Sequence, residues 1–291
     1  MKKLFALCLV FSLLLVGCRR TNDTHVSTNK TTVKKAKRKT ATKKKTTTKK
    51  STSTKKSTKK KTVKKKKTVK KKTVAKKSTN ANYYICIDAG HQAKGNNSLE
   101  PVGPGSSTKK PKVSSGTSGV ATKKSEAQLN LEVALKLQKE LVKRGYKVMM
   151  IRTTQNVDIS NAQRAIKANN AKVDATVRLH ADGSTNRNMH GFSILQPGYN
   201  NRYMNKQIIT KSRQLSACVN KAFASATNAK NNGLSTRNDM TGFNWSKVPV
   251  TLVEMGFMSN AKEDRLLSTQ SYQNKMVQGI ANGLDNYFKK V

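Results

Sequence analysis

The segment Tyr83-Tyr84-Ile85-Cys86-Ile87-Asp88-Ala89-Gly90-His91 decides the fold, because the folded part of the chain begins with it. Its apolar run over residues 83–87 has the length of a buried β-strand, and Ala89-Gly90 predicts a tight turn directly after it. We therefore expect a strand over residues 83–88, with His91 just beyond its carboxyl end.

Downstream of this strand, apolar runs and helix-like spacings alternate in units of about 30 residues, the length of a strand–helix–strand repeat. The expected strands are 147–151, 173–179, 191–195 and 249–253. The expected helices are 125–144, 160–171, 204–226, 262–268 and 271–289. This alternation predicts one α/β domain over residues 82–291, with a mostly parallel sheet flanked by helices.

Residues 95–119 interrupt this alternation and are rich in Gly, Ser, Pro and Lys. That composition predicts one long loop, which either gates or shapes a groove or is solvent-exposed filler. The two cysteines of the domain, Cys86 and Cys218, either pair in an oxidising compartment or remain as buried free thiols. We favour free thiols, since small apolar side chains of this kind are common in cores.

Residues 1–17 have the pattern of an export signal. Lys2 and Lys3 precede an apolar run from Leu4 to Val16, which as a helix spans about 20 Å and is too short for a bilayer core of about 30 Å. The run ends in Leu15-Val16-Gly17-Cys18, which resembles the lipobox of bacterial lipoproteins. The resemblance implies lipid chains on Cys18 and an exported protein anchored to the cell membrane, facing the wall or periplasm. A plain secretory signal with an incidental cysteine is the alternative.

The positive charge is concentrated in the front part of the chain. Residues 1–81 hold 29 Lys and Arg against Asp23 alone, a net charge of +28 out of +45 for the whole chain. Residues 18–81 are dominated by Lys and Thr and lack an apolar stripe, which predicts a disordered basic linker. The linker either contacts anionic wall polymers or is a plain spacer. Because it is exported and carries no aromatic residue for base stacking, we expect no nucleic-acid partner.

Histidine and glutamate gather at the predicted carboxyl ends of the strands. His91 follows the first strand, His180 the third and Glu254 the last, while Glu126 opens the helix after the long loop. In open α/β sheets these ends lie at one edge, where ligands bind. The domain holds only three His and six Glu, so this convergence is informative.

Two histidines with one carboxylate form a common catalytic zinc set that leaves a position for water. A second carboxylate can then take a proton and pass it to a leaving nitrogen, as amide hydrolysis requires. Spacing alone leaves purely structural roles for these residues open.

Several motifs occur in the order found in one enzyme family. They are Asp88-Ala89-Gly90-His91, Ser125-Glu126, Arg164 with Ala168-Asn169 and Asp174, Leu179-His180-Ala181, and Val253-Glu254-Met255-Gly256-Phe257-Met258-Ser259-Asn260. Together they resemble the zinc-dependent N-acetylmuramoyl-L-alanine amidases of bacterial cell walls, of the family 3 type. The resemblance covers about residues 83–288, and the last motif is the most specific.

The resemblance implies a Zn²⁺ cofactor with His91, Glu126 and His180 as ligands and Glu254 as the catalytic carboxylate. It implies a twisted, mostly parallel sheet and action on peptidoglycan, at the amide between the lactyl group of N-acetylmuramic acid and L-alanine. We also expect a monomer. Two other functions stay open: a non-catalytic wall- or polyanion-binding lipoprotein on an amidase fold, and a zinc peptidase or deacylase acting elsewhere in the wall.

Three positions depart from the family pattern, which usually has Pro at Ala89, Gly at Gln92 and often Asn at Asp182. Asp88 and Asp182 each stand near an expected ligand, and each either orients an imidazole or only caps a turn.

Other polar residues have weaker signals. Asn244 and Trp245 either contact a sugar or pack, His190 is expected to be structural or exposed, and Arg178 is expected to point to the other face of its strand.

Overall fold

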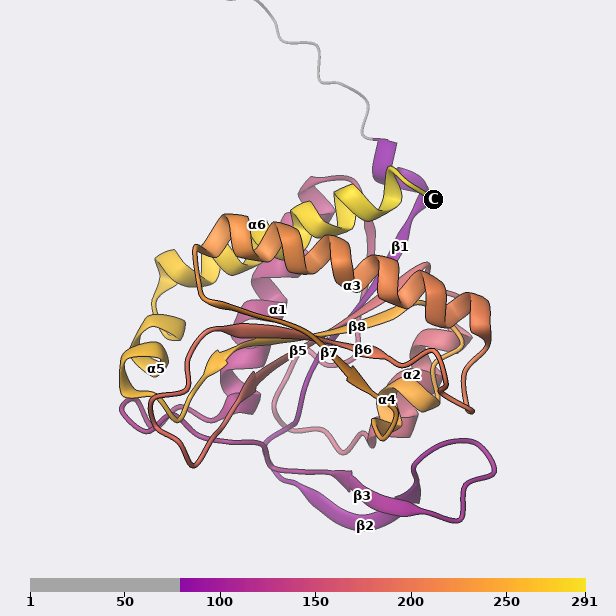
Figure 1. Cartoon of the computed structure of the whole chain (residues 1–291), viewed down its shortest axis with the longest axis horizontal. Coiled ribbons are helices and arrows are strands. Elements are labelled where there is room, and N and C mark those ends of the chain that lie inside the picture. The colour runs from indigo at the N-terminus through magenta and orange to yellow at the C-terminus, as the bar shows by residue number, and fades with distance from the viewer. Residues whose placement is uncertain (1–78) are drawn as a thin grey trace, which may run out of the picture. The chain divides into compact units, whose positions relative to one another are not determined.

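Residues 79–291 are described by the computed structural model, and they are built around one six-stranded sheet (Figure 1). The strands lie in the order β4-β1-β5-β8-β6-β7. Their bounds are β1 (Tyr84–Ala89), β4 (Lys147–Met150), β5 (Ala175–Asp182), β6 (Phe192–Pro197), β7 (Asn231–Arg237) and β8 (Val250–Phe257). The predictions for the signal peptide, for Cys18 and for most of the linker concern residues outside the described range.

The sheet is mixed but mostly parallel. Strands β4, β1, β5 and β8 are parallel to one another, β6 runs antiparallel to β8, and β7 is parallel to β6. The predicted fold class is therefore confirmed. In the register of β5 and β8, His180 lies opposite Glu254, so strand pairing itself brings these two candidate residues together.

Helices cover both faces of the sheet (Figure 1). They are α1 (Glu126–Lys143), α2 (Asn161–Asn170), α3 (Lys206–Thr227), α4 (Thr241–Asn244), α5 (Ala261–Leu267) and α6 (Gln270–Phe288), with a short 3₁₀ helix η1 (Thr79–Asn82) before β1. Helices α1, α3 and α6 pack together on one face, where Ile85 and Ile87 of β1 join their core. Helix α2 covers the other face, where Ala168 packs on Cys86.

Helix starts follow the expected capping chemistry. The side chain of Ser125 accepts a hydrogen bond from the Gln128 backbone N–H at the start of α1. Ser160 and Gln163 form a capping box at the start of α2. These caps satisfy backbone N–H groups that have no partner within the helix, and the first of them places Glu126 in the first helical turn.

The predicted loop over residues 95–119 is the main correction to the predicted fold. It contains an antiparallel hairpin of β2 (Asn96–Pro101) and β3 (Lys109–Val113). Its strands are polar and mostly exposed, so they lack the apolar alternation that identifies a strand. The same reason explains why β7 was not predicted: it is a polar, largely exposed strand at the edge of the sheet.

Cys86 and Cys218 are both buried free cysteines, as the sequence predicted. Within residues 79–291, no helix combines the length and the apolar character needed to cross a membrane.

Candidate metal centre

Three candidate ligands converge at the carboxyl edge of the sheet. His91 follows β1, His180 lies near the end of β5, and Glu126 opens α1. The Nε2 atom of His91 lies 3.0 Å from Glu126 Oε1 and 3.1 Å from His180 Nδ1, and the latter lies 3.0 Å from the same Oε1. These atoms form the one His/Cys/Asp/Glu group in the described part of the chain whose geometry suits a metal ion.

His91 is held by its backbone and by the segment after β3. Its φ is +58°, in the left-handed region that non-glycine residues rarely adopt and that is concentrated at functional sites. Its Nδ1 lies 2.8 Å from the backbone carbonyl of Ser114. A donated Nδ1–H there leaves the Nε2 lone pair directed at the other two ligands, which is the usual arrangement of a metal-binding imidazole.

Glu126 is held by backbone N–H groups as well as by the imidazoles. Its Oε2 accepts from the Thr117 N–H at 3.0 Å, and its Oε1 accepts from the Ala181 N–H at 3.2 Å. Burial alone would raise the pKa of Glu126, but hydrogen bonds with His180 and His91 outweigh it and hold the pKa well below its usual range. The group is therefore a carboxylate at neutral pH.

His180 is buried beneath the turn that follows β1. A Cβ atom added at Gly90 would lie 2.3 Å from its ring, so only glycine allows the turn after β1 to approach this closely. Burial lowers the pKa of His180 to about 4, which keeps the imidazole neutral at pH 7. Its Nε2 is buried without a hydrogen-bond partner among the described residues.

The donor set fits zinc. Two nitrogen ligands and one oxygen ligand at bond lengths of about 2.0–2.1 Å in a tetrahedron lie about 3.3 Å apart, close to the separations of 3.0–3.1 Å found here. Two neutral imidazoles and one carboxylate also match a catalytic zinc set in charge and chemistry.

Glu254 lies beside this group without belonging to it. With His91, Glu126 and His180 it lines a hollow of about 600 Å³ at the sheet edge. Its Oε2 is buried with no hydrogen-bond partner among residues 79–291. Burial, and then the negative charges of Glu126 and Asp182, raise the pKa of Glu254 well above its usual range. Such a group can both accept and release a proton.

Asp182 lines the same hollow but touches neither imidazole. Its Oδ1 accepts from the Gly183 N–H at 2.7 Å, which is the turn-capping role.

Asp88 does not contact an imidazole, and this corrects the alternative in which it orients one directly. Its Oδ1 accepts from Arg164 Nη1 at 2.7 Å and its Oδ2 from Arg178 Nε at 2.8 Å. Arg164 in turn donates to the backbone carbonyls of Ala89 and His91. Asp88 therefore supports the turn that carries His91, and it does so through a buried arginine.

Replacing Asp88 with Asn is expected to destabilise the domain by about 3–5 kcal/mol, because two buried guanidinium groups lose their counter-ion. This corresponds to a fall in Tm of about 10 °C. The flanking arginines hold the pKa of Asp88 well below its usual range despite burial. Its stabilisation is therefore complete above about pH 4 and is lost as the pH falls towards its folded pKa.

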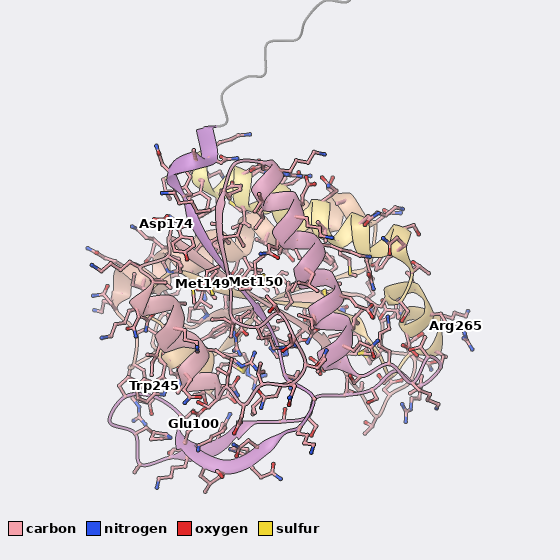
Figure 2. All side chains as sticks on the ribbon, turned by 180° about the vertical axis from the view of Figure 1, so that it is seen from behind. Glu100, Met149, Met150, Asp174, Trp245 and Arg265 are labelled. Carbon is pink, nitrogen blue, oxygen red and sulfur yellow. The ribbon has the colours of Figure 1, made fainter. Side chains whose placement is uncertain are left out.

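Thermal and urea unfolding of the variant at pH 7 and pH 3 measures this loss. Asp174→Asn is the matched control, because Asp174 is an exposed carboxylate at the opposite end of the sheet (Figure 2). An equal effect of the two substitutions contradicts the assigned role of Asp88.

The segment after β3 contributes to the site in a way that the sequence did not indicate. The Ser114 carbonyl holds His91, and the Thr117 N–H holds Glu126. A Cβ atom added at Gly116, whose φ is +79°, would lie 2.7 Å from Glu126 Oε2. The segment is therefore not solvent-exposed filler at this end, because its backbone shapes the site.

The remaining candidates lie away from the reacting groups. Asn244 is buried, and its side-chain amide donates hydrogen bonds to the backbone carbonyls of Val102 and Asn238. The Trp245 indole N–H donates to the Pro101 carbonyl, which ties it to the hairpin (Figure 2). Packing is therefore the role of both. His190 is exposed, as expected.

Comparisons with known proteins identify the family of this chain. The sequence profile of Amidase_3, N-acetylmuramoyl-L-alanine amidase, matches residues 85–286. The chain is 23% identical over 163 residues to the uncharacterised protein YqiI of Bacillus subtilis, covering 56% of this chain and 74% of that one. It is 26% identical over 172 residues to the probable cell wall amidase LytH of Staphylococcus epidermidis, covering 59% of this chain and about half (53%) of LytH.

Solved structures share the fold. The amidase Ami1 of Mycobacterium smegmatis matches with a TM-score of 0.65 at 23% identity, covering 73% of this chain and 99% of that one. The catalytic domain of the amidase CwlV of Paenibacillus polymyxa matches with a TM-score of 0.57 at 26% identity, covering 71% and 98%. Because the family profile spans well over half of its residues, the chain belongs to the Amidase_3 family of N-acetylmuramoyl-L-alanine amidases.

Proposed function

We propose that this chain is a zinc-dependent peptidoglycan amidase that cleaves the amide between the lactyl group of N-acetylmuramic acid and L-alanine. The observation that carries the proposal is the convergence of His91, Glu126 and His180 on one point beside the unpartnered carboxylate oxygen of Glu254. Membership of the amidase family and the cell-wall role named for LytH support it.

In this proposal His91 Nε2, His180 Nδ1 and Glu126 Oε1 hold the ion. Zinc, when bound, supplies a Lewis acid that polarises the amide carbonyl and lowers the pKa of water. The Ser114 carbonyl fixes the His91 ring, and the N–H groups of Thr117 and Ala181 fix the carboxylate. The ligands are thus oriented before substrate binds, which avoids an entropic cost during the reaction.

Glu254 is the proton carrier. It takes the proton of the attacking water and later gives it to the nitrogen of the departing L-alanine, so the amine leaves in neutral form. A carboxyl group with a raised pKa suits this double task, because it holds the proton between the two steps.

Product analysis tests the proposal. Purified peptidoglycan is digested with the zinc-loaded protein, and the products are identified by mass spectrometry. The proposal expects stem peptides with free L-alanine amino termini and glycan chains with intact N-acetylmuramic acid. Cleavage within the stem peptide, or loss of acetyl groups from the sugars, would identify a peptidase or deacetylase instead. Wall binding without any product would identify a non-catalytic protein.

We also propose that Cys18 carries lipid chains and that the basic linker joins this anchor to the domain. The described chain begins and ends at the sheet edge opposite the metal-ligand edge, where Tyr83 stacks on Phe288 with ring centroids 4.1 Å apart (Figure 1). Residue 79, where the described part of the chain begins, therefore lies at the end of the domain away from the reacting groups.

Replacing Cys18 with Ser is expected to move the protein from the membrane fraction to the soluble exported fraction, because the acyl chains are lost. Fractionation with immunoblotting, and labelling with a clickable fatty acid, measure this change. Cys8→Ser is the matched control, since Cys8 lies inside the predicted signal peptide. Membrane retention and continued labelling of the Cys18 variant contradict the anchor.

A further inference from the structure

The candidate site lies between two neighbouring hollows. The central hollow shares His91, Ser114, His180 and Glu254 with a neighbouring hollow on the β3 side. On the α5 side it shares Arg187 and Ser259 with a second neighbour. The three hollows therefore adjoin one another, with the proposed zinc ligands in the central one and an outer hollow, here called an arm, on each side.

The β3-side arm contains cations that are already paired. Lys110 Nζ lies 2.9 Å from Asp239 Oδ2. Arg178 Nε lies 2.8 Å from Asp88 Oδ2. Asp88 also pairs with Arg164, and Asp239 also pairs with Arg237. Both cations that line this arm nevertheless lie against a carboxylate, so neither is without an ion-pair partner.

The α5-side arm has the opposite character. The side chains of Arg187 and Lys262 have no hydrogen-bond or ion-pair partner within residues 79–291, and both line this arm. Its single carboxylate, Glu263, already accepts from the N–H groups of Gly191 at 2.7 Å and Phe257 at 2.8 Å. The arm therefore carries unpaired positive charge, which favours an anionic ligand.

Arg187 has a special place in this arm, because it lines the central hollow as well. It is the only Lys or Arg in the lining of that hollow. A planar guanidinium with free donors binds a carboxylate through two parallel hydrogen bonds.

The two sides of the proposed scissile bond differ in charge, as the two arms do. The muramoyl side is a neutral sugar, because its lactyl carboxyl is consumed in the amide. On the leaving side, the second stem residue is a D-glutamate joined through its side-chain carboxyl, so its α-carboxylate is free. This carboxylate lies within about 7 Å of the scissile nitrogen, and it is the first negative charge that the leaving peptide presents.

We propose that Arg187 binds this α-carboxylate and thereby makes the enzyme selective for stem peptides with an unamidated second residue. The inference rests on the proposed amidase function. It assigns the peptide to the α5-side arm and the sugar to the β3-side arm, and it makes Arg187 a specificity-determining residue.

Two ligands that differ only in this group test the inference: N-acetylmuramoyl-L-alanyl-γ-D-glutamyl-L-lysine and the same molecule with the α-carboxyl of its D-glutamate amidated. Cleavage by the zinc-loaded wild type is followed by mass spectrometry, and binding to the Glu254→Gln variant is followed by calorimetry. We expect the enzyme to prefer the acid over the amide by about 5- to 20-fold. This preference is smaller than that of a buried ion pair, because Arg187 is exposed. The preference is expected in KM and in Kd, with kcat nearly unchanged.

Arg187→Gln is expected to remove this preference while leaving KM for the amide unchanged, and Arg187→Lys to keep part of it. Arg265→Gln is the matched control, because Arg265 loses the same charge from nearby α5 but lies at the periphery, outside all three hollows (Figure 2). It is expected to keep the full preference.

The outcomes separate the inference from the function on which it rests. Equal use of both ligands by the wild type, or a preference that survives Arg187→Gln, overturns the inference and leaves the amidase proposal intact. Binding of the acid that depends on Arg187 without cleavage of either ligand overturns the amidase proposal and keeps the carboxylate site. If neither ligand is cleaved or bound, both fail.

Discussion

Replacing Glu254 with Gln is expected to lower kcat for peptidoglycan cleavage by about 10²- to 10⁴-fold, the usual range for loss of a general acid–base group. The amide keeps the size and most of the contacts of the carboxylate, but it can neither take a proton from water nor give one to the leaving nitrogen. Glu254 is not among the three converging donors. We therefore expect the variant to keep one zinc ion per chain and an unchanged fold.

Kinetics on soluble muramoyl peptides, with metal analysis of the same samples, measure this effect. Asp182→Asn is the comparison variant, because it makes the same change of charge in a neighbouring carboxylate of the hollow. Its Oδ1 already accepts from the Gly183 N–H, so we expect a loss of less than about tenfold. Equal losses in both variants would falsify a specific role for Glu254 and point to a general effect of negative charge.

The main elements of this fold can be predicted because their apolar patterns are strong. The run over residues 83–87 and the amphipathic pattern of α1 each identify a buried surface without reference to the rest of the chain. Once the strands are assigned, their carboxyl ends are known. Because parallel strands end on the same side of a sheet, His91, His180 and Glu254 are predicted to meet at one edge. The hairpin and β7 have polar, exposed strands, so their stability depends on pairing that the local sequence does not report.

The contacts that hold the candidate ligands are less predictable than the ligands themselves. Asp88 pairs with Arg164 across 76 residues of sequence and with Arg178 across 90. The position of Ser114 depends on how the hairpin returns to the sheet, and its contribution is a backbone carbonyl that any residue type supplies. Sequence proximity places Asp88 next to His91, whereas the tertiary structure directs its carboxylate to the arginines.

Replacing His91 with Gly is expected to remove the metal and to lower activity by at least about 10³-fold, because the Lewis acid chemistry is lost with the ion. The binding free energy of zinc at a structural site with four ligands is about 10–16 kcal/mol. One ligand therefore accounts for roughly 3 kcal/mol, or about 100-fold in zinc affinity. The side chain of His91 is partly exposed, and its Nδ1 partner is a backbone carbonyl that water can satisfy.

Glycine is the informative substitution because the φ of His91 is +58°. A left-handed backbone costs a non-glycine residue about 1 kcal/mol or more, and glycine adopts it without this cost. The metal-free variant should therefore unfold within about 1 kcal/mol of the metal-free wild type, even though it has lost the ligand. A histidine kept for packing predicts the reverse, with clear destabilisation and undiminished metal binding.

Metal content by plasma mass spectrometry after dialysis, and urea unfolding with and without zinc, separate the two cases. His190→Ala is the control for metal content, since this third histidine of the domain is exposed and its Nδ1 contacts the Asn188 carbonyl. Zinc is expected to stabilise the wild type and the His190 variant and to leave His91→Gly unaffected, because only a form with intact ligands binds it. One zinc ion per chain in His91→Gly, held with the affinity of the wild type, would exclude His91 as a ligand, whatever the activity.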